Sequence, residues 1–149
     1  MMRHLFTCLY FAALALLAAC AAAPPAPPPA ISFSPTQTSD EKKFIVSISP
    51  LAEPVSINQI HSWRINLTTP SGVPVTKAAF FIGGGMPDHG HGFPTRPVVT
   101  ETPAPGVYLL EGMKFSMHGR WEIKFAIQAG VVSDVVTFNT LVALPALSK

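Results

Sequence analysis

The chain has 149 residues, with 10 Lys and Arg against 8 Asp and Glu and a formal net charge of +2. Such a weak, unclustered positive charge argues against a nucleic-acid-binding surface, which requires clustered basic residues. Beyond the apolar N-terminal segment, no second long apolar run indicates a membrane-spanning helix.

The first twenty residues have the organisation of an export signal. Arg3 carries the one fixed positive charge of a short N-terminal region, and an uncharged Leu- and Ala-rich run extends from Leu5 to Ala19. This run is shorter than the about 20 apolar residues of a permanent membrane helix, so residues 1–19 are predicted to be a cleavable signal peptide. The sequence Leu17-Ala-Ala-Cys20 resembles the lipobox of bacterial lipoproteins, whose cysteine is acylated and becomes the new N-terminus.

This resemblance implies that the mature protein lies on the periplasmic side of the cell envelope, anchored to a membrane by the lipid on Cys20. Ala21 follows the cysteine, at the position where some Gram-negative bacteria place Asp to retain lipoproteins in the inner membrane. The outer membrane is therefore favoured. Ordinary secretion, with cleavage after an Ala, is the alternative, but it leaves the position of Cys20 unexplained.

The cysteine content restricts the chemistry of the mature chain. Of the two Cys, Cys8 lies within the predicted signal peptide and Cys20 is the predicted lipid attachment site. The mature chain can then form no disulfide and has no thiol for catalysis or metal binding. A metal site would have to use His, Met, carboxylates or the backbone.

The composition divides the rest of the chain into a spacer, a domain and a tail. Residues 20–39 are predicted to comprise the lipidated Cys20 and a Pro/Ala-rich linker. Its Ala- and Pro-rich part favours extended polyproline II, at about 3.1 Å per residue, and would hold the domain off the membrane. Residues 40–140 have the length of one ordinary domain. Residues 141–149 form a tail for which no structure is predicted.

The domain is rich in β-branched and aromatic residues, with Pro and Gly between short runs. No stretch has sustained helical periodicity, so we predict an all-β fold, a β-sandwich of about seven strands. Trp63 and Trp121 fall on the apolar phase of their strands and are expected in the core. The predicted strands are residues 43–49, 59–68, 75–82, 96–102, 106–115, 119–128 and 131–140.

Met and His concentrate in one part of the chain, in a segment that starts at Met86 with the sequence MPDHGHG and in a second that ends at His118. Met thioether selects Cu(I), and imidazole binds Cu(I), Cu(II) and Zn(II). Because free thiolates oxidise outside the cytoplasm, Met and His are the usable ligands there. Gly90 lets the backbone bend, so the rings of His89 and His91 are expected to converge on a metal ion.

Spacing alone leaves several assignments open. The His pair can instead belong to a turn with solvated imidazoles, with the methionines packed in the core, and Met113 is expected to be a core residue. Met117 or His118 is expected to supply a third ligand, but not both, because neighbours on a strand point in opposite directions. Asp88 is either an acceptor that orients an imidazole or, as we favour, a turn residue.

These motifs resemble the YtkA-like family, which is related to FixH and consists of small extracytoplasmic domains. The matching patterns, within residues 40–140, are Met-Pro-x-His-x-His from Met86, Gly-x-Tyr ending at Tyr108, and Met-x-Gly-x-Trp from Met117. The resemblance implies an Ig-like β-sandwich and an association with copper handling or cytochrome oxidase assembly. By motif, it carries over Met86, His89, His91 and Met117 as candidate ligands. His118 stands where the family commonly has Pro, which leaves its role open.

We therefore expect a lipid-anchored copper-binding protein, a carrier or buffer of Cu(I) or Cu(II), whose partner is a copper-receiving or other envelope protein. The alternative is a structural or interaction module whose loop docks a partner without metal. An enzyme is not expected, because no nucleophile elbow surrounds a Ser and no paired carboxylates occur. The triple glycine Gly83–Gly85 lacks the Lys-Ser/Thr of a phosphate loop and is expected to be a bend that leads into the His loop.

Overall fold

A computed structural model describes residues 30–144 of the chain. They form two antiparallel sheets, which confirms the predicted all-β sandwich. The predicted signal peptide, Cys20 and most of the linker lie outside the described residues, as do residues 145–149. Among the residues that the structure describes, no helix is long and apolar enough to cross a membrane.

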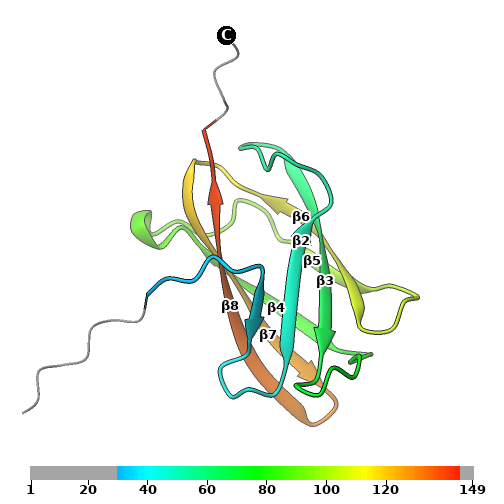
Figure 1. The fold of residues 1–149 in the computed structure, drawn as a ribbon. Helices are drawn as coiled ribbons and strands as arrows, with labels where there is room; N and C mark the ends of the chain where they lie inside the picture. Colours follow the sequence, from blue (N-terminus) through cyan, green and yellow to red (C-terminus); the bar gives the residue numbers. More distant parts are fainter. Residues whose placement is uncertain (1–29, 145–149) are drawn as a thin grey trace, which may run out of the picture. The chain divides into compact units, whose positions relative to one another are not determined.

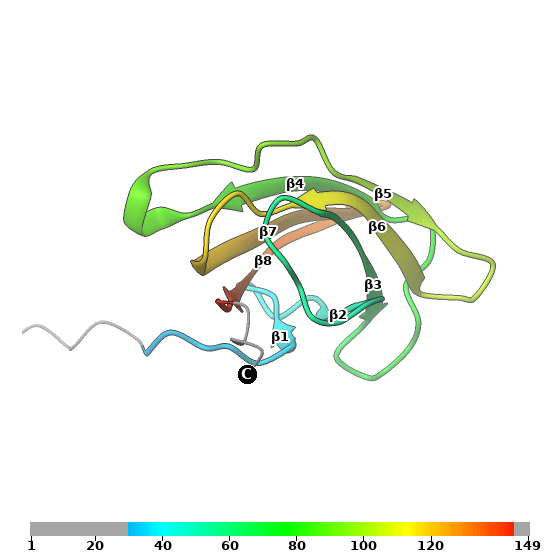
Figure 2. The same cartoon turned by 90° about the horizontal axis from the view of Figure 1, so that it is seen from above.

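One sheet has five strands in the order β1-β2-β3-β6-β5, and the other has three in the order β4-β7-β8. Every pair of neighbouring strands is antiparallel. The two sheets face each other, with β4, β7 and β8 on one side and β1, β2 and β3 on the other (Figures 1 and 2). The elements are β1 (Thr36–Thr38), β2 (Ile45–Pro50), β3 (Ile60–Thr68), β4 (Ala79–Gly85), the short 3-10 helix η1 (Pro87–His89), β5 (Val98–Glu101), β6 (Val107–Lys114), β7 (Gly119–Ala129) and β8 (Val132–Val142).

Seven of these strands, β2 to β8, correspond to the seven predicted ones, with ends displaced by a few residues. The strand β1 was not predicted, because its three residues are polar and show no apolar alternation. It pairs with β2 and so extends the sheet into the range that the sequence assigned to the linker. At the other end of the domain, β8 continues to Val142, beyond the predicted boundary at residue 140.

Aromatic side chains fill the space between the sheets. Trp63 of β3 and Trp121 of β7 are 4% and 0% exposed, which confirms both as core residues. Between them lies Phe115, whose ring meets that of Trp63 at 6.5 Å and that of Trp121 at 5.3 Å, both edge to face. Such pairs contribute about 0.5–1.5 kcal/mol each beyond the area they bury. This aromatic cluster packs against the segment that follows the His pair, through Phe93.

The carboxylate of Asp134 fastens the segment before β2 to β8. It is buried and accepts hydrogen bonds from the backbone N–H groups of Glu41 (3.1 Å), Lys43 (3.2 Å) and Val135 (2.7 Å). Burial disfavours the charged form, but the nearby Ser39 hydroxyl and these N–H groups outweigh it and lower the pKa of Asp134 to about 2. The folded state therefore stabilises the ionised form of Asp134.

Because folding lowers the pKa of Asp134 from its ordinary 3.8, the resulting stabilisation is fully present above about pH 4 and is lost as the pH falls toward about 2. We expect Asp134→Asn to lower the free energy of unfolding at neutral pH by about 2 kcal/mol and to weaken its pH dependence in this acid range. Urea unfolding followed at neutral pH and at several acidic pH values measures both effects. An acid dependence equal to that of the wild type would contradict this role.

Candidate functional site

The Met- and His-bearing segments meet at the end of the three-stranded sheet, where β4 leads into η1 and β7 begins. The last residue of β4, Gly85, pairs with Glu122 near the start of β7. Figure 1 shows η1 as a projection beyond this end of the sheet. The sequence brings the two segments together because β4 and β7 are antiparallel partners, so the end of one lies beside the start of the other.

The triple glycine continues β4, so the expectation of a bend at Gly83–Gly85 is wrong. The three glycines pair with Lys124, Ile123 and Glu122 of β7. At Gly85, with φ +148°, a Cβ would lie 2.1 Å from the carbonyl oxygen of His91. Only glycine lets the backbone approach so closely. The glycines therefore allow close packing of the His loop against the strand rather than flexibility.

The backbone of the His loop is closed by its own hydrogen bonds. The N–H of Met86 donates to the carbonyl of His91 at 2.6 Å, and the N–H of His91 donates to the carbonyl of Met86 at 3.3 Å. Between them, η1 ends at Gly90 in the left-handed conformation, with φ 66°. Met86 and His91 thus hold the ends of a tight loop, with His89 inside it.

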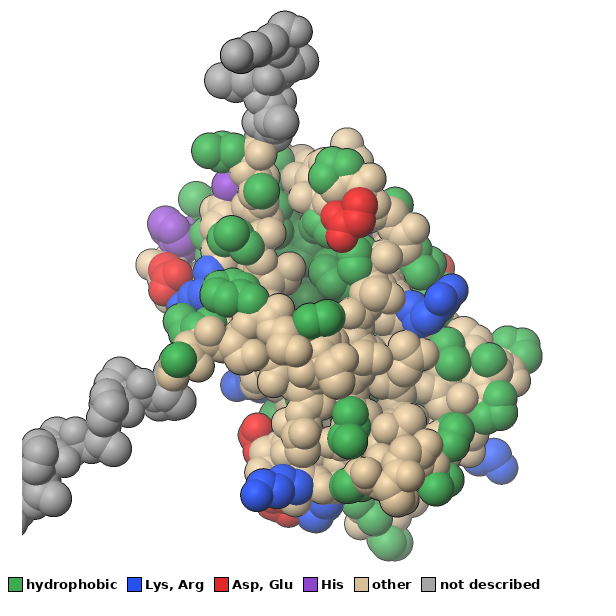
Figure 3. All heavy atoms as spheres, in the orientation of Figure 1, with side chains coloured by type: hydrophobic (Ala, Val, Ile, Leu, Met, Phe, Trp, Pro, Cys, Tyr) green, Lys and Arg blue, Asp and Glu red, His purple; other side chains and the backbone are tan. Residues whose placement is uncertain are grey.

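The imidazoles of His89 and His91 project from this loop into solvent. Both residues are exposed, and their rings lie nearly parallel, 16° apart, with centres separated by 6.2 Å. Figure 3 shows His side chains on this projection beside acidic and basic ones. Metal–nitrogen bonds of about 2.0–2.1 Å place the centres of two rings on one ion at most roughly 6 Å apart. Both side chains are exposed, so they have room to rotate toward one ion.

Met86 turns its side chain inward. It is 3% exposed and belongs to the hydrophobic core, and a Cβ at Gly119 would lie 2.6 Å from its methyl carbon. The side chain therefore lies against the backbone at the start of β7. Met86 also lines a shallow concavity with His91 and Glu122. In this arrangement the thioether anchors the base of the loop.

A charged pair ties the tip of the loop to β7. Arg120 donates two hydrogen bonds to the carboxylate of Asp88, from Nη2 at 2.8 Å and from Nε at 3.4 Å. The hydrogen bond from Arg120 lowers the pKa of Asp88, and the pair raises the pKa of Arg120. Asp88 thus holds the loop in place, a role that the two readings from the sequence did not include.

The sequence interpretation missed Arg120 and Glu122. The third guanidinium nitrogen of Arg120, Nη1, donates to Glu122 at 3.0 Å and to Asn139 of β8 at 3.2 Å. Two residues apart on β7, Arg120 and Glu122 share one face of the sheet. Their opposite charges at this spacing were the available signal, but the sequence did not show that Asp88 would lie above that face.

Aromatic packing fixes the rest of the loop and the connection between β6 and β7. Phe93, after the His pair, stacks on Trp121 with ring centres 5.7 Å apart and an angle of 15°. The indole N–H of Trp121 donates to the carbonyl of Met117 at 3.0 Å. Trp121 therefore contacts both of the segments on which the candidate ligands lie.

The remaining candidates occupy different surroundings. Met113 is fully buried, as expected. Met117 and His118 lie between β6 and β7, so the alternation of a strand does not apply to them. Met117 is 38% exposed, whereas His118 lines a separate cavity with Ile57 and Leu144. Among residues 30–144, no three His, Cys, Asp or Glu side chains come together as a metal-binding group. A metal site here would combine the His pair with Met or an external ligand.

Comparison with known proteins identifies a family for this chain. The sequence profile described as YtkA-like matches residues 38–126. A solved structure, the ZirS C-terminal domain, is similar at 15% sequence identity and a TM-score of 0.42, over 83% of this chain and 87% of that one. No curated protein matches the chain.

The Asp88–Arg120 pair predicts how the His loop responds to loss of one charge. We expect Asp88→Asn to accelerate hydrogen exchange at the N–H groups of His89 and His91 by about fivefold, because the loop opens more often without its ionic contact. Exchange followed by NMR measures the effect. Glu41→Gln is the matched control, since it removes a surface carboxylate that pairs with Lys43 away from the loop. Equal exchange rates in the wild type and Asp88→Asn would show that the pair does not hold the loop.

Proposed function

This chain belongs to the YtkA-like family, and we propose that it is a lipid-anchored protein of the periplasmic side of the envelope that binds copper through His89 and His91. The copper ion is its cargo, so the protein is a carrier or buffer and not an enzyme. The observation that carries this proposal is the exposed, nearly parallel imidazole pair on a loop whose backbone is held firmly.

The donor set suits copper. Two imidazoles serve either oxidation state of copper, and a thioether adds preference for Cu(I). The proposal assigns the imidazoles of His89 and His91 as the main ligands and Met117, which is partly exposed, as the thioether donor. Met86 has its side chain in the core and supports the loop from below. His118 is left out of the site, because it lines a different cavity with Ile57.

Exposure of the ligands supports a carrier. A resident catalytic metal is usually enclosed and oriented by further hydrogen bonds to its ligands, whereas neither imidazole here is buried. An exposed pair can pass its ion to a second protein without unfolding of the loop. The lipid on Cys20 would confine that exchange to the membrane surface, where a copper-receiving envelope protein is the proposed partner.

The first experiment changes the two imidazoles. We expect the full chain in detergent micelles to bind about one copper ion, and His89→Ala with His91→Ala to weaken binding by more than the roughly 10–100-fold that loss of an outer-sphere partner costs. Competition with a chromophoric Cu(I) chelator, and a parallel Cu(II) titration, measure affinity. His118→Ala is the matched control and should bind as the wild type does. Equal affinity of the double variant and the wild type would refute the proposed site.

The second experiment tests the anchor independently of metal. We expect the wild-type chain, expressed in a Gram-negative host with radiolabelled palmitate, to carry the label and to remain with the membrane fraction. Cys20→Ser should lose the label, since no other sulfur is available at the end of the signal peptide. A Cys20→Ser chain that is still labelled, or a wild-type chain without label, would show that Cys20 is not the lipid attachment site.

A further inference from the structure

Away from the His loop, two adjoining cavities form a groove at one end of the sandwich. One, of about 270 Å³, lies between β8, the end of β2 and the connection from β2 to β3, and is lined by Ile48, Trp63 and Phe138. The other, of about 510 Å³, is lined by Ile57, His118 and Leu144. Both cavities share the residues Pro54, Val55 and Ala143. We call the two together the end groove.

The rim of the end groove is apolar and exposed. Phe33, Leu141 and Leu144 are 51%, 64% and 74% exposed, and each lines one of its two cavities. Figure 3 shows the hollow between the end of β8 and the β2–β3 connection, with hydrophobic side chains on its floor. Large apolar side chains gathered around a concavity are typical of surfaces that bind another molecule.

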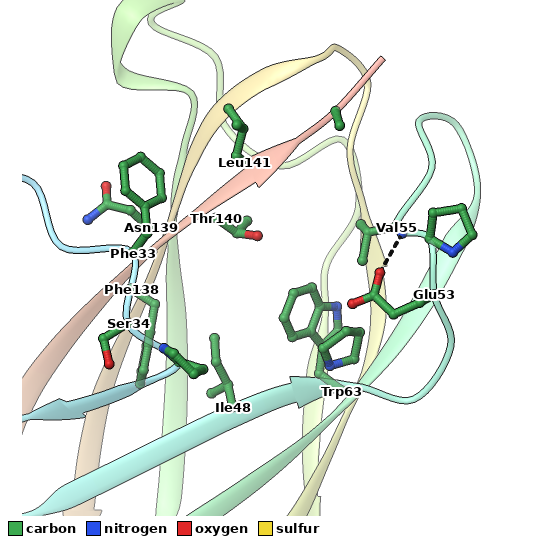
Figure 4. A pocket seen from close by; sticks show the side chains of 14 residues that line it. Phe33, Ser34, Ile48, Glu53, Val55, Trp63, Phe138, Asn139, Thr140 and Leu141 are labelled. Carbon is green, nitrogen blue, oxygen red and sulfur yellow. Dashed lines mark hydrogen bonds between the residues drawn. The ribbon is translucent and has the colours of Figure 1, made fainter. Parts of the chain in front are cut away.

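A buried polar atom beside the end groove has no partner among residues 30–144. The indole nitrogen of Trp63 is the one fully buried side-chain nitrogen or oxygen among residues 30–144 without a hydrogen bond. Figure 4 shows this nitrogen on the edge of the ring that faces Glu53 and Val55, across the groove. A buried donor without an acceptor costs about 1–3 kcal/mol. An oxygen placed between the ring and the segment Glu53–Val55 would remove that cost, and because the nitrogen is closed to solvent, this segment must shift for a ligand to reach it.

The edge of β8 adds main-chain hydrogen-bonding groups beside the same groove. β8 is the outer strand of its sheet, and the carbonyl of Val135 points away from β7, because it accepts from Asp40 at 2.8 Å. Main-chain groups alternate along a strand, and the pairing with β7 is continuous. Those of Leu141 therefore also point away from β7, and within residues 30–144 they have no backbone partner.

We propose that the end groove binds an extended peptide segment of a partner protein. A carbonyl of the peptide accepts the indole N–H of Trp63, its main chain pairs with β8 at Leu141, and an apolar side chain enters the cavity above Ile48 and Phe138. Strand addition of this kind draws affinity from main-chain hydrogen bonds and specificity from a side-chain pocket. This inference uses none of the proposed metal ligands, so it stands or falls independently of copper binding.

The chemistry of the groove favours a peptide over a purely apolar ligand. An acyl chain would satisfy neither the indole donor nor the edge groups of Leu141, whereas each peptide unit offers both an acceptor and a donor. Glu53 adds a carboxylate at the rim, with one oxygen accepting the N–H of Val55 at 3.2 Å. Its charge favours a peptide that carries Lys or Arg next to the inserted apolar residue.

The test uses a defined probe, the capped pentapeptide acetyl-Lys-Val-Leu-Val-Lys-amide, added to the ¹⁵N-labelled full chain in detergent micelles. We expect saturable NMR shifts at the indole N–H of Trp63 and the amide of Leu141, with half-saturation at about 1 mM. The indole N–H of Trp121, which already donates to Met117, is the internal control and should not shift. The same peptide with Gly in place of Leu should bind at least several-fold more weakly.

Two variants decide the matter. Trp63→Phe removes the donor but keeps an aromatic ring and should raise the half-saturating concentration about tenfold. Leu141→Pro removes the N–H that faces away from β7 and leaves the pairing with β7 in place, so it should also weaken binding. No saturation by the wild type up to about 10 mM peptide would overturn the proposal. Binding of the peptide by both variants with the affinity of the wild type would overturn it too. A chain that is dimeric without peptide, and that Leu141→Arg makes monomeric, would identify a second copy as the occupant instead.

Discussion

The position of both candidate ligand segments depends on the packing of Trp121. Its ring is fully buried, stacks on Phe93 from the loop after η1, and meets Phe115 edge to face. Its N–H holds the carbonyl of Met117 in the connection that precedes β7. One side chain thereby connects two stretches of chain that are separated in sequence by a whole hairpin. It adds to the pairing of β4 with β7, which already places the end of the His loop beside the start of β7.

The His loop combines a fixed backbone with free side chains. The hydrogen bonds between Met86 and His91 and the contact from Asp88 to Arg120 restrict the main chain, so little conformational entropy remains to be lost there when a ligand binds. The imidazoles themselves are exposed and can rotate. This division suits the proposed copper site, because side-chain rotations alone would separate its loaded and empty states.

The connection between β6 and β7 divides two surfaces that we propose bind different ligands. Within it, Met117 is exposed and fastened through its carbonyl to Trp121, while His118 lines the end groove. Met117 and His118 therefore lie in different surroundings, because the connection that carries them is not an extended strand. Two independent surfaces on one small sandwich are compatible with a protein that has a cargo and a docking partner.

The sequence by itself determined the strands β2 to β8 and core positions on them, because apolar alternation with period two reports which face is buried: Trp63 and Trp121 were both identified in this way. It also indicated His89 and His91 as candidate ligands, since ligand chemistry depends on residue type and short spacing. The tertiary structure alone decided three things: that Gly83–Gly85 is strand, that Asp88 contacts Arg120, and that Met86 is buried while Met117 is exposed. Each depends on which backbone approaches which across the sheet, and residue patterns along a chain do not encode such long-range contacts directly.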